Sequence, residues 1–334
     1  MRLYQNMFKP IYQFQNLDKV SWIHLSANPN AIHILEKNLD KINWYMLSGN
    51  INAIPILQKI MHKIYWYNID WTMLSGNPNA IPILENNLNK VNWIMLSSNP
   101  NAIHILEKNL HNVDWTYLSG NPNAIPILEK NLDKVACYKV YWSYLSKNPN
   151  AIPILEKNLD KVNWSWLSEN PNAIPILEKN LDKVIWSWLS SNPNAIPILE
   201  KNLDNVNWCY LSSNPNAIPI LEKNLDKVDW YLLSENPNAI HILEKNLDKV
   251  YWDILSGNPN AIPILEKNLD KVNWEYLSIN PNAQLLLSKL DYQAMKLNAK
   301  EFSRELAEYV FHPERVIRIC ERNDLELLDL LEIL

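Results

Sequence analysis

The stretch WSWLSENPNAIPILEKNLDKVI, residues 164–185, decides the fold, because near-copies of it recur along most of the chain. Each copy begins at a tryptophan, and successive copies start 22 residues apart except for two gaps of 27. A unit this short cannot bury a core of its own, so we expect neighbouring units to stack. The tryptophans that begin the twelve units are Trp22, Trp44, Trp71, Trp93, Trp115, Trp142, Trp164, Trp186, Trp208, Trp230, Trp252 and Trp274.

Two residue types mark the limits of the repeats. All four phenylalanines and all five arginines lie outside residues 22–283. Residues 16–20, NLDKV, match the tail of a unit, so residues 1–21 are interpreted as an N-terminal cap formed by a degenerate half-repeat. The sequence therefore predicts a repeat solenoid over 22–283 between this cap and a C-terminal helical cap over 284–334.

Apolar residues within each unit have helical spacing. Ile174, Leu177, Leu181 and Val184 follow steps of three and four, which trace one face of a longer helix. A shorter helix is expected to begin at Trp164. The pattern predicts an all-α fold, an α-solenoid of about twelve 22-residue helix-turn-helix repeats.

Asparagine and proline separate the two helices of a unit. Asn172 is expected to be the N-cap of the longer helix, and Pro175 lies in its first turn, where a missing N–H costs little. Asn170 precedes Pro171 and is expected to end the shorter helix in a left-handed conformation. With packed helices ~8–10 Å apart, the stack would span on the order of 100 Å.

A leucine-rich repeat is the alternative fold. The segment LSEN, residues 167–170, places a leucine three residues before an asparagine, as that family does. The family also requires an apolar residue two before the leucine, where this chain has Asp253 and Glu275 in two of its units. A buried strand does not tolerate carboxylates there, so helical repeats are favoured.

Composition excludes several classes of protein. The net charge of −5 and pI near 5.8 argue against a surface that follows a polyphosphate, so we do not expect a nucleic-acid partner. No apolar run suits a membrane span, and the N-terminus lacks a secretory signal, so we expect neither membrane insertion nor secretion. Cys137, Cys209 and Cys320 have no paired spacing, which is typical of a reducing compartment.

The repeat resembles a known group of viral proteins. The phrase LSxNPNAI(P/H)ILEKNLDKVNW resembles the tandem-repeat proteins of giant amoeba-infecting DNA viruses. Residues 306–315, LAEYVFHPER, are similar to the terminal segment of such proteins, including ankyrin-like ones. The resemblance covers nearly the whole chain. It implies a viral repeat scaffold that acts in the host cytoplasm or is carried in the virion.

The sequence contains no set of residues typical of catalysis. The four glycines all follow the repeat serine, so no phosphate-binding loop is present, and the seven histidines lack metal-ligand spacing. The serine of each unit is expected to bond the backbone rather than act as a nucleophile. We therefore expect no enzymatic activity, no metal and no cofactor.

The units differ from one another chiefly at two positions, which are position 2 and position 6 when the tryptophan is counted as position 1. They lie four residues apart and hence on one helix face. Such a variable stripe is a candidate partner-binding surface, and unselected surface variation is the alternative. The candidates are Tyr45, Thr72, Ile94, Thr116, Ser143, Lys147, Ser165, Glu169, Ser187, Cys209, Tyr231, Glu235, Asp253 and Glu275.

The two longer gaps carry five-residue insertions. The first insertion places Tyr65, Trp66 and Tyr67 next to one another. Aromatic residues on a protruding turn suit an interface, and a longer helix end is the alternative interpretation.

These observations favour a non-enzymatic scaffold that binds a host or viral protein. A self-associating structural component of the virion is the second hypothesis. A nucleic-acid-binding solenoid is the third.

Overall fold

The computed structural model describes residues 12–61, 68–131 and 139–290. These residues are mostly helical and repeat with the period of the sequence, which confirms the predicted all-α solenoid. The chain divides into two compact units, Asp18–Gln284 and a second formed by Met1–Leu17 with Leu285–Leu334.

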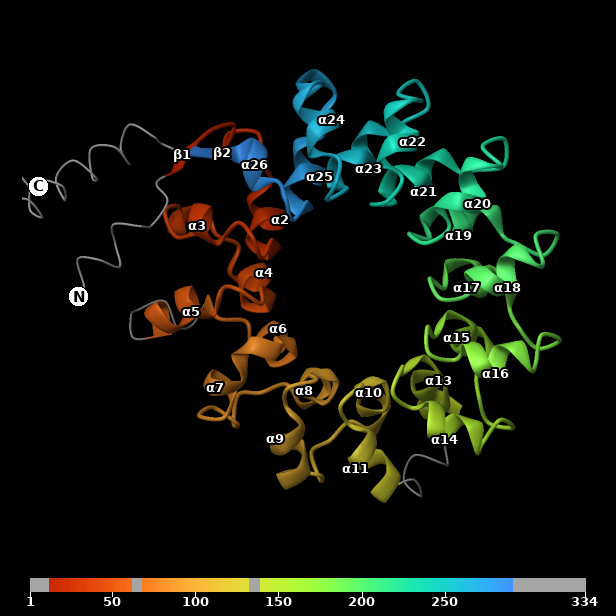
Figure 1. Cartoon of the computed structure of the whole chain (residues 1–334). Coiled ribbons are helices and arrows are strands. Elements are labelled where there is room, and N and C mark those ends of the chain that lie inside the picture. The colour runs from red at the N-terminus through yellow and green to blue at the C-terminus, as the bar shows by residue number, and fades with distance from the viewer. Residues whose placement is uncertain (1–11, 62–67, 132–138, 291–334) are drawn as a thin grey trace, which may run out of the picture. The chain divides into compact units, whose positions relative to one another are not determined.

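Each of the first eleven repeats contributes a pair of short helices, and the twelfth contributes an inner helix. Figure 1 shows the first helix of each pair on the inner side of the unit Asp18–Gln284 and the second on the outer side. The inner helices are α2 (Trp22–Ala27), α4 (Trp44–Gly49), α6 (Trp71–Gly76), α8 (Trp93–Ser98), α10 (Trp115–Gly120), α13 (Lys139–Lys147), α15 (Trp164–Glu169), α17 (Trp186–Ser191), α19 (Trp208–Ser213), α21 (Trp230–Glu235), α23 (Trp252–Gly257) and α25 (Trp274–Ile279). The outer helices are α3 (Ile32–Leu35), α5 (Ile54–Met61), α7 (Ile81–Leu84), α9 (Ile103–Lys108), α11 (Ile125–Lys130), α14 (Ile152–Glu156), α16 (Ile174–Glu178), α18 (Ile196–Glu200), α20 (Ile218–Glu222), α22 (Ile240–Glu244) and α24 (Ile262–Glu266). Short 3₁₀ turns are η1 (Leu39–Lys41), η3 (Pro78–Ala80) and η4 (Leu269–Lys271).

The core of the repeats is built on leucine rather than tryptophan. In α15, Leu167 is fully buried, and the equivalent leucine is fully buried in every inner helix. Trp164 is only half-buried, and the ammonium group of Lys183 lies 5.1 Å from the centre of its ring. The tryptophan therefore closes the edge of the core under a lysine, a contact that adds a cation–π attraction to its packing.

The outer helix is shorter than the sequence pattern predicts. α16 ends at Glu178, Leu181 is 39% exposed, and Val184 is buried in an extended segment instead of on a helix face. The cause is Asn180, whose side-chain nitrogen donates to the Ile176 carbonyl at 2.8 Å. In a continuing helix that carbonyl would accept from the backbone N–H of residue 180, so the side chain ends the helix.

Asn170 and Asn172, which recur in the repeats, form side-chain hydrogen bonds to the preceding repeat. Asn170 is not left-handed (φ −69°, ψ 117°), and Ala173, not Asn172, is the N-cap of α16. The side-chain nitrogen of Asn170 donates to the carbonyls of Ser146 at 2.9 Å and Asn148 at 3.1 Å in the preceding repeat. The side-chain nitrogen of Asn172 donates to the Pro149 carbonyl of the preceding repeat at 3.0 Å. The left-handed conformation expected for Asn170 and the N-cap role expected for Asn172 are therefore both wrong.

The repeat serine forms a second link between units. The Ser168 hydroxyl donates to the Trp164 carbonyl at 2.7 Å and accepts the backbone N–H of Ile185 at 3.1 Å. Since Ile185 is the N-cap of α17, the serine links one inner helix to the start of the following one. This confirms the expected backbone-bonding role of the serine.

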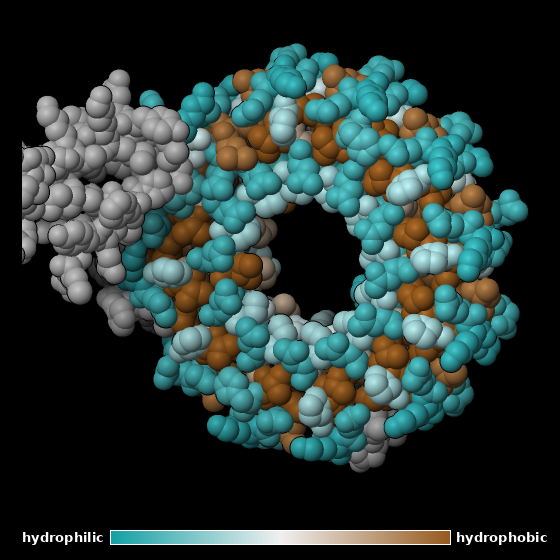
Figure 2. All heavy atoms as spheres, viewed as in Figure 1, coloured by the Kyte–Doolittle hydropathy of each residue, from teal (hydrophilic) through white to brown (hydrophobic). Residues whose placement is uncertain are grey.

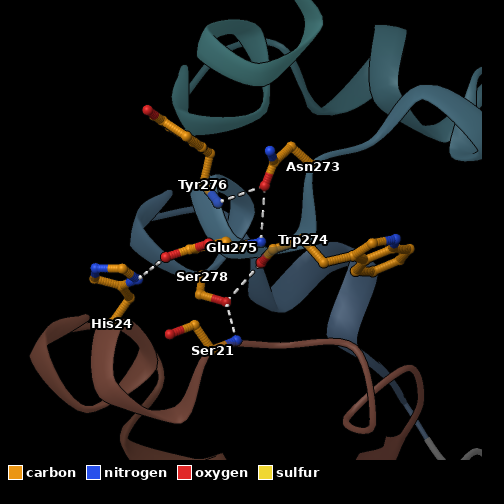
Figure 3. Close-up of polar contacts among 7 residues, drawn as sticks. All are labelled: Ser21, His24, Asn273, Trp274, Glu275, Tyr276 and Ser278. Atoms are coloured by element: carbon orange, nitrogen blue, oxygen red, sulfur yellow. Dashed lines mark hydrogen bonds and ion pairs between the residues drawn. The ribbon is translucent and has the colours of Figure 1, made fainter.

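The same links join the last repeat to the first. α2 packs against α25, and the side-chain nitrogen of Asn28 donates to the carbonyls of Ser278 at 3.1 Å and Asn280 at 2.8 Å. The backbone N–H of Ser21 donates to the Ser278 hydroxyl at 2.9 Å, as Figure 3 shows. The twelve repeats of the unit Asp18–Gln284 therefore form a closed ring (Figure 1), and the expectation of an elongated stack is wrong.

Residues from the start of the chain complete the last repeat. The ammonium group of Lys19 lies 4.9 Å from the centre of the Trp274 ring, as that of Lys41 lies 5.0 Å from the ring of Trp22. Val20 is buried like the valines two residues before the tryptophans of other repeats, such as Val162 and Val184. Residues 18–21 therefore take the place of the last residues of the twelfth repeat. The repeat pattern alone had indicated an N-terminal cap for this segment.

The second unit contains a short antiparallel sheet. Strand β1 (Tyr12–Phe14) pairs with β2 (Ser288–Leu290), and helix α26 (Gln284–Leu287) precedes β2 in the chain. Both strands lie outside the helix pairs, so the leucine-rich alternative, with a strand in every repeat, is excluded. The predicted C-terminal helical cap falls mostly on residues outside the described ranges.

Ile185 occupies the N-cap of α17 without a side-chain hydrogen bond and is 40% exposed. Asn163 at the equivalent position of α15 accepts the N–H of Trp166. We expect Ile185→Asn to raise the free energy of unfolding by about 1 kcal/mol in urea denaturation, because it supplies the missing cap. Asn163→Ala is the matched control and should lower it by a similar amount; an unchanged midpoint for Ile185→Asn would contradict this account.

Candidate functional site

The inner helices present one exposed face. Positions 4 and 5, the repeat leucine and serine, are fully buried, which leaves positions 2, 3 and 6 as the accessible ones. Figure 2 shows an opening through the middle of the ring, lined mainly by residues of intermediate to polar character. Apolar residues form a band between this lining and the polar outer edge. The inner helices therefore offer a surface that differs chemically from the charged outer rim.

None of the described candidate residues at positions 2 and 6 is buried. The exposed ones are Tyr45, Thr72, Ile94, Lys147, Cys209, Tyr231, Glu235, Asp253 and Glu275. The half-buried ones are Thr116, Ser143, Ser165, Glu169 and Ser187. Tyr65, Trp66 and Tyr67 lie outside the described residues. The structure thus brings the two predicted rows together on the exposed face of successive inner helices.

Several position-2 residues contact the N-cap residue of the next inner helix. The Ser143 hydroxyl accepts from the side-chain nitrogen of Asn163 at 3.0 Å. The Cys209 thiol donates to the Asp229 carboxylate at 3.3 Å. Desolvation, followed by this carboxylate, raises the pKa of the Cys209 thiol, so the sulfur is held in its unreactive form. These contacts give part of the predicted row a role in joining repeats.

Position 6 contains one ion pair between neighbouring repeats. The ammonium group of Lys147 lies 3.3 Å from the Glu169 carboxylate and 4.6 Å from the centre of the Trp166 ring. A partly exposed pair of this kind stabilises by only about 0–1 kcal/mol. Its larger effect is to hold the indole of Trp166 in place.

The structure adds a third row of exposed residues, those at position 3, which the variation between repeats did not indicate. Position 3 holds His24, Met46, Met73, Met95, Tyr117, Tyr144, Trp166, Trp188, Tyr210, Leu232, Ile254 and Tyr276. Five consecutive repeats have an aromatic residue there, and we call these five the aromatic arc: Tyr117, Tyr144, Trp166, Trp188 and Tyr210. Each of them is 37–40% exposed. In the sequence, position 3 is occupied by large residues in every repeat, a pattern that is usually interpreted as core.

Rings of the aromatic arc contact one another in three neighbouring pairs. The ring centres of Trp166 and Trp188 are 6.3 Å apart in a stacked arrangement, and those of Trp188 and Tyr210 are 6.1 Å apart. The tilted pair Tyr117 and Tyr144 is 5.8 Å apart. Stacking between rings on adjacent repeats fixes their orientation, so the arc is a rigid, partly apolar surface.

Histidines of the outer helices pair with glutamates of the preceding repeat. His104 lies 2.5 Å from the Glu85 carboxylate, and His241 lies 2.6 Å from that of Glu222. Burial lowers the pKa of His33, which occupies the same repeat position. Within the described ranges, no three His, Cys, Asp or Glu side chains gather where they could hold a metal ion.

No protein-family model matches the chain, and comparison with curated proteins and with solved structures finds no match either. Among the described residues, every helix is too short or too polar to reach across a bilayer.

Proposed function

We propose that the chain is a non-enzymatic scaffold that binds a protein partner through the inner helices of its ring. The observation that carries this proposal is the aromatic arc. Tyrosine and tryptophan supply large contact area at low entropic cost and are enriched among the residues that dominate protein interfaces. The five half-exposed rings, at 37–40% exposure, leave unburied surface that a partner would cover.

The surroundings of the arc support a protein partner over a nucleic acid. Stacked aromatic rings can also hold unpaired bases, but such sites combine the rings with a basic groove. Position 6 in these repeats has one lysine, Lys147, and it is paired with Glu169. The net charge of −5 opposes polyphosphate binding further. The resemblance to giant-virus repeat proteins suggests a host or viral protein as the partner.

The test places a photoreactive amino acid in the arc at Tyr210 and, as a control, at the exposed Leu203 outside the inner helices. Crosslinking in lysate of the host amoeba, followed by mass spectrometry, identifies the captured protein. Capture at Tyr210 but not at Leu203 is the expected result. The purified partner is then titrated, and Trp188→Ala should weaken binding by about 30-fold, the loss typical of a central aromatic residue.

Each other outcome has a definite meaning. Equal capture at both positions, or unchanged affinity of Trp188→Ala, would refute binding through the arc. Adducts with a second copy of the chain would favour a self-associating structural component instead. Adducts with DNA or RNA that weaken steeply with salt would favour the nucleic-acid alternative.

A further inference from the structure

A pocket lies beyond the aromatic arc, on repeats ten to twelve of the ring. It has a volume of about 210 Å³ and is lined by Tyr231, Tyr251, Trp252, Asp253, Ile254 and Tyr276. Pockets for drug-sized ligands are usually larger, ~300–1,000 Å³, so this one suits a single small group. Four of its six lining residues are aromatic, and the only charged one is a carboxylate.

Tyr251 departs from the repeat pattern because it lacks the N-cap hydrogen bond of the equivalent residues. Asn207, Asp229 and Asn273 occupy the equivalent position of neighbouring repeats, and each accepts a backbone N–H at the start of its inner helix. Tyr251 makes no such hydrogen bond, and its side chain is 52% exposed. Loss of a cap costs about 1 kcal/mol. Ile185 lacks the same hydrogen bond, but only Tyr251 lines the pocket.

The hollow exists because residue sizes change between the arc and these repeats. In the arc, position 3 is filled by stacked aromatic rings, whereas here it holds Ile254. The smaller side chain leaves space between Tyr276 and the pair formed by Tyr231 and Tyr251. That pair meets edge to face, with ring centres 5.4 Å apart and an interplanar angle of 75°. The rings of Tyr231 and Tyr251 therefore form two adjoining walls of the pocket.

The charge of the pocket selects for a cation. The Asp253 carboxylate accepts one hydrogen bond, from the side-chain nitrogen of Asn273 at 2.9 Å, and the pocket lining contains no basic residue. The faces of aromatic rings carry negative potential and attract cations, most strongly those that shed water easily. The indole of Trp252 already has the Lys271 ammonium 4.6 Å from its centre, so the three tyrosines and Asp253 remain for a ligand.

We propose that this pocket binds an alkylammonium cation, such as a quaternary ammonium group or the methylated side chain of a lysine. Tyrosine faces enclose the methyl groups, and Asp253 supplies the opposite charge. A free small molecule and a modified protein side chain present the same chemistry, and only the second source rests on the protein-binding function proposed above. A neutral group of the same shape gains neither the ring attraction nor the carboxylate.

The test titrates the full chain with choline and with 3,3-dimethylbutan-1-ol, its uncharged carbon isostere, using tyrosine fluorescence and NMR. Choline should bind with saturation, and the isostere at least about tenfold more weakly. A trimethyl-lysine peptide and its unmodified form serve as the second arm. Tighter binding of the modified peptide than of choline assigns the site to a protein ligand, and the reverse assigns it to a free cation.

Tyr251→Asn is the decisive variant because it removes a pocket wall and restores the repeat cap. It should abolish choline binding while raising stability, whereas Ile185→Asn makes the equivalent change in a repeat outside the pocket and should leave binding intact. Asp253→Asn should weaken choline by about tenfold and leave the isostere unchanged. Equal binding of choline and its isostere, no saturable binding, or full affinity in Tyr251→Asn would overturn the proposal. None of these results depends on the partner of the aromatic arc.

Discussion

Replacing Asn170 with aspartate is expected to lower the free energy of unfolding by about 3–5 kcal/mol, the cost of a buried charge without a partner. The side-chain nitrogen of Asn170 donates to two carbonyl oxygens, those of Ser146 at 2.9 Å and Asn148 at 3.1 Å. A carboxylate oxygen in its place cannot donate and would repel both. Asn170 is only 1% exposed, so water does not replace the lost donors. Urea denaturation followed by circular dichroism measures the change.

The matched control is Asn172→Asp in the same turn. Its side-chain nitrogen makes a single exposed hydrogen bond, to the Pro149 carbonyl at 3.0 Å, so a loss of under about 1 kcal/mol is expected. Similar losses for the two variants would show that the burial of Asn170 is not what makes it important.

Asn28→Asp is expected to open the ring at the junction of the last and first repeats. The new carboxylate would face the carbonyls of Ser278 and Asn280, which now accept at 3.1 and 2.8 Å. The covalent chain does not link α25 to α2, so only non-covalent contacts hold this junction, among them those of Asn28, those of Lys19 and Ser21, and the pairing of β1 with β2. Fluorescent labels on exposed Asp40 and Asp270, in a background with the native cysteines replaced, should show a large fall in energy transfer.

Two controls separate opening from unfolding. Labels on Asp226 and Asp270 also lie two repeats apart, and their energy transfer should be unchanged by Asn28→Asp. Asn170→Asp, which disturbs a different junction, should leave the Asp40–Asp270 transfer high. Low transfer between Asp40 and Asp270 in the unsubstituted protein would mean that the ring does not close in solution.

The helix pairs were predictable because their causes are local. Tryptophan at a 22-residue period and apolar steps of three and four require stacked helical units whatever the neighbours do. The directions of the asparagine side chains were not predictable in this way. An asparagine such as Asn172 before a helix normally caps it, and only the position of the preceding repeat shows that the Pro149 carbonyl is a competing acceptor.

The ring closes because each repeat is rotated relative to the one before it, by one twelfth of a turn on average. No pattern of residues in the sequence indicates this rotation directly. The sequence nevertheless contains a sign of it. Residues 16–20 repeat the tail of a unit, and the last unit departs from the pattern after Ala283, so each end of the chain holds what the other lacks. Interpreting the first segment as a cap separated two parts of one repeat.

The candidate site was half predictable. Variation between units pointed to positions 2 and 6, which the structure places on the exposed face of the inner helices. Position 3 was missed because bulky residues at a regular spacing are usually core. Only the three-dimensional arrangement shows that Trp166 and Trp188 stack at the surface, and that Tyr251 exchanges a cap for a pocket wall.

The hydrogen bonds of Asn28 across the junction of the last and first repeats have a consequence for how this gene can change. Tandem DNA copies readily gain or lose one copy through unequal recombination, and an open array of units tolerates such events by growing or shrinking. Here an added or deleted copy would change the rotation that closure requires between successive repeats. The first and last repeats would then no longer meet. The closed ring therefore constrains the number of copies, whereas exposed side chains outside the aromatic arc and the pocket can differ between copies without affecting closure.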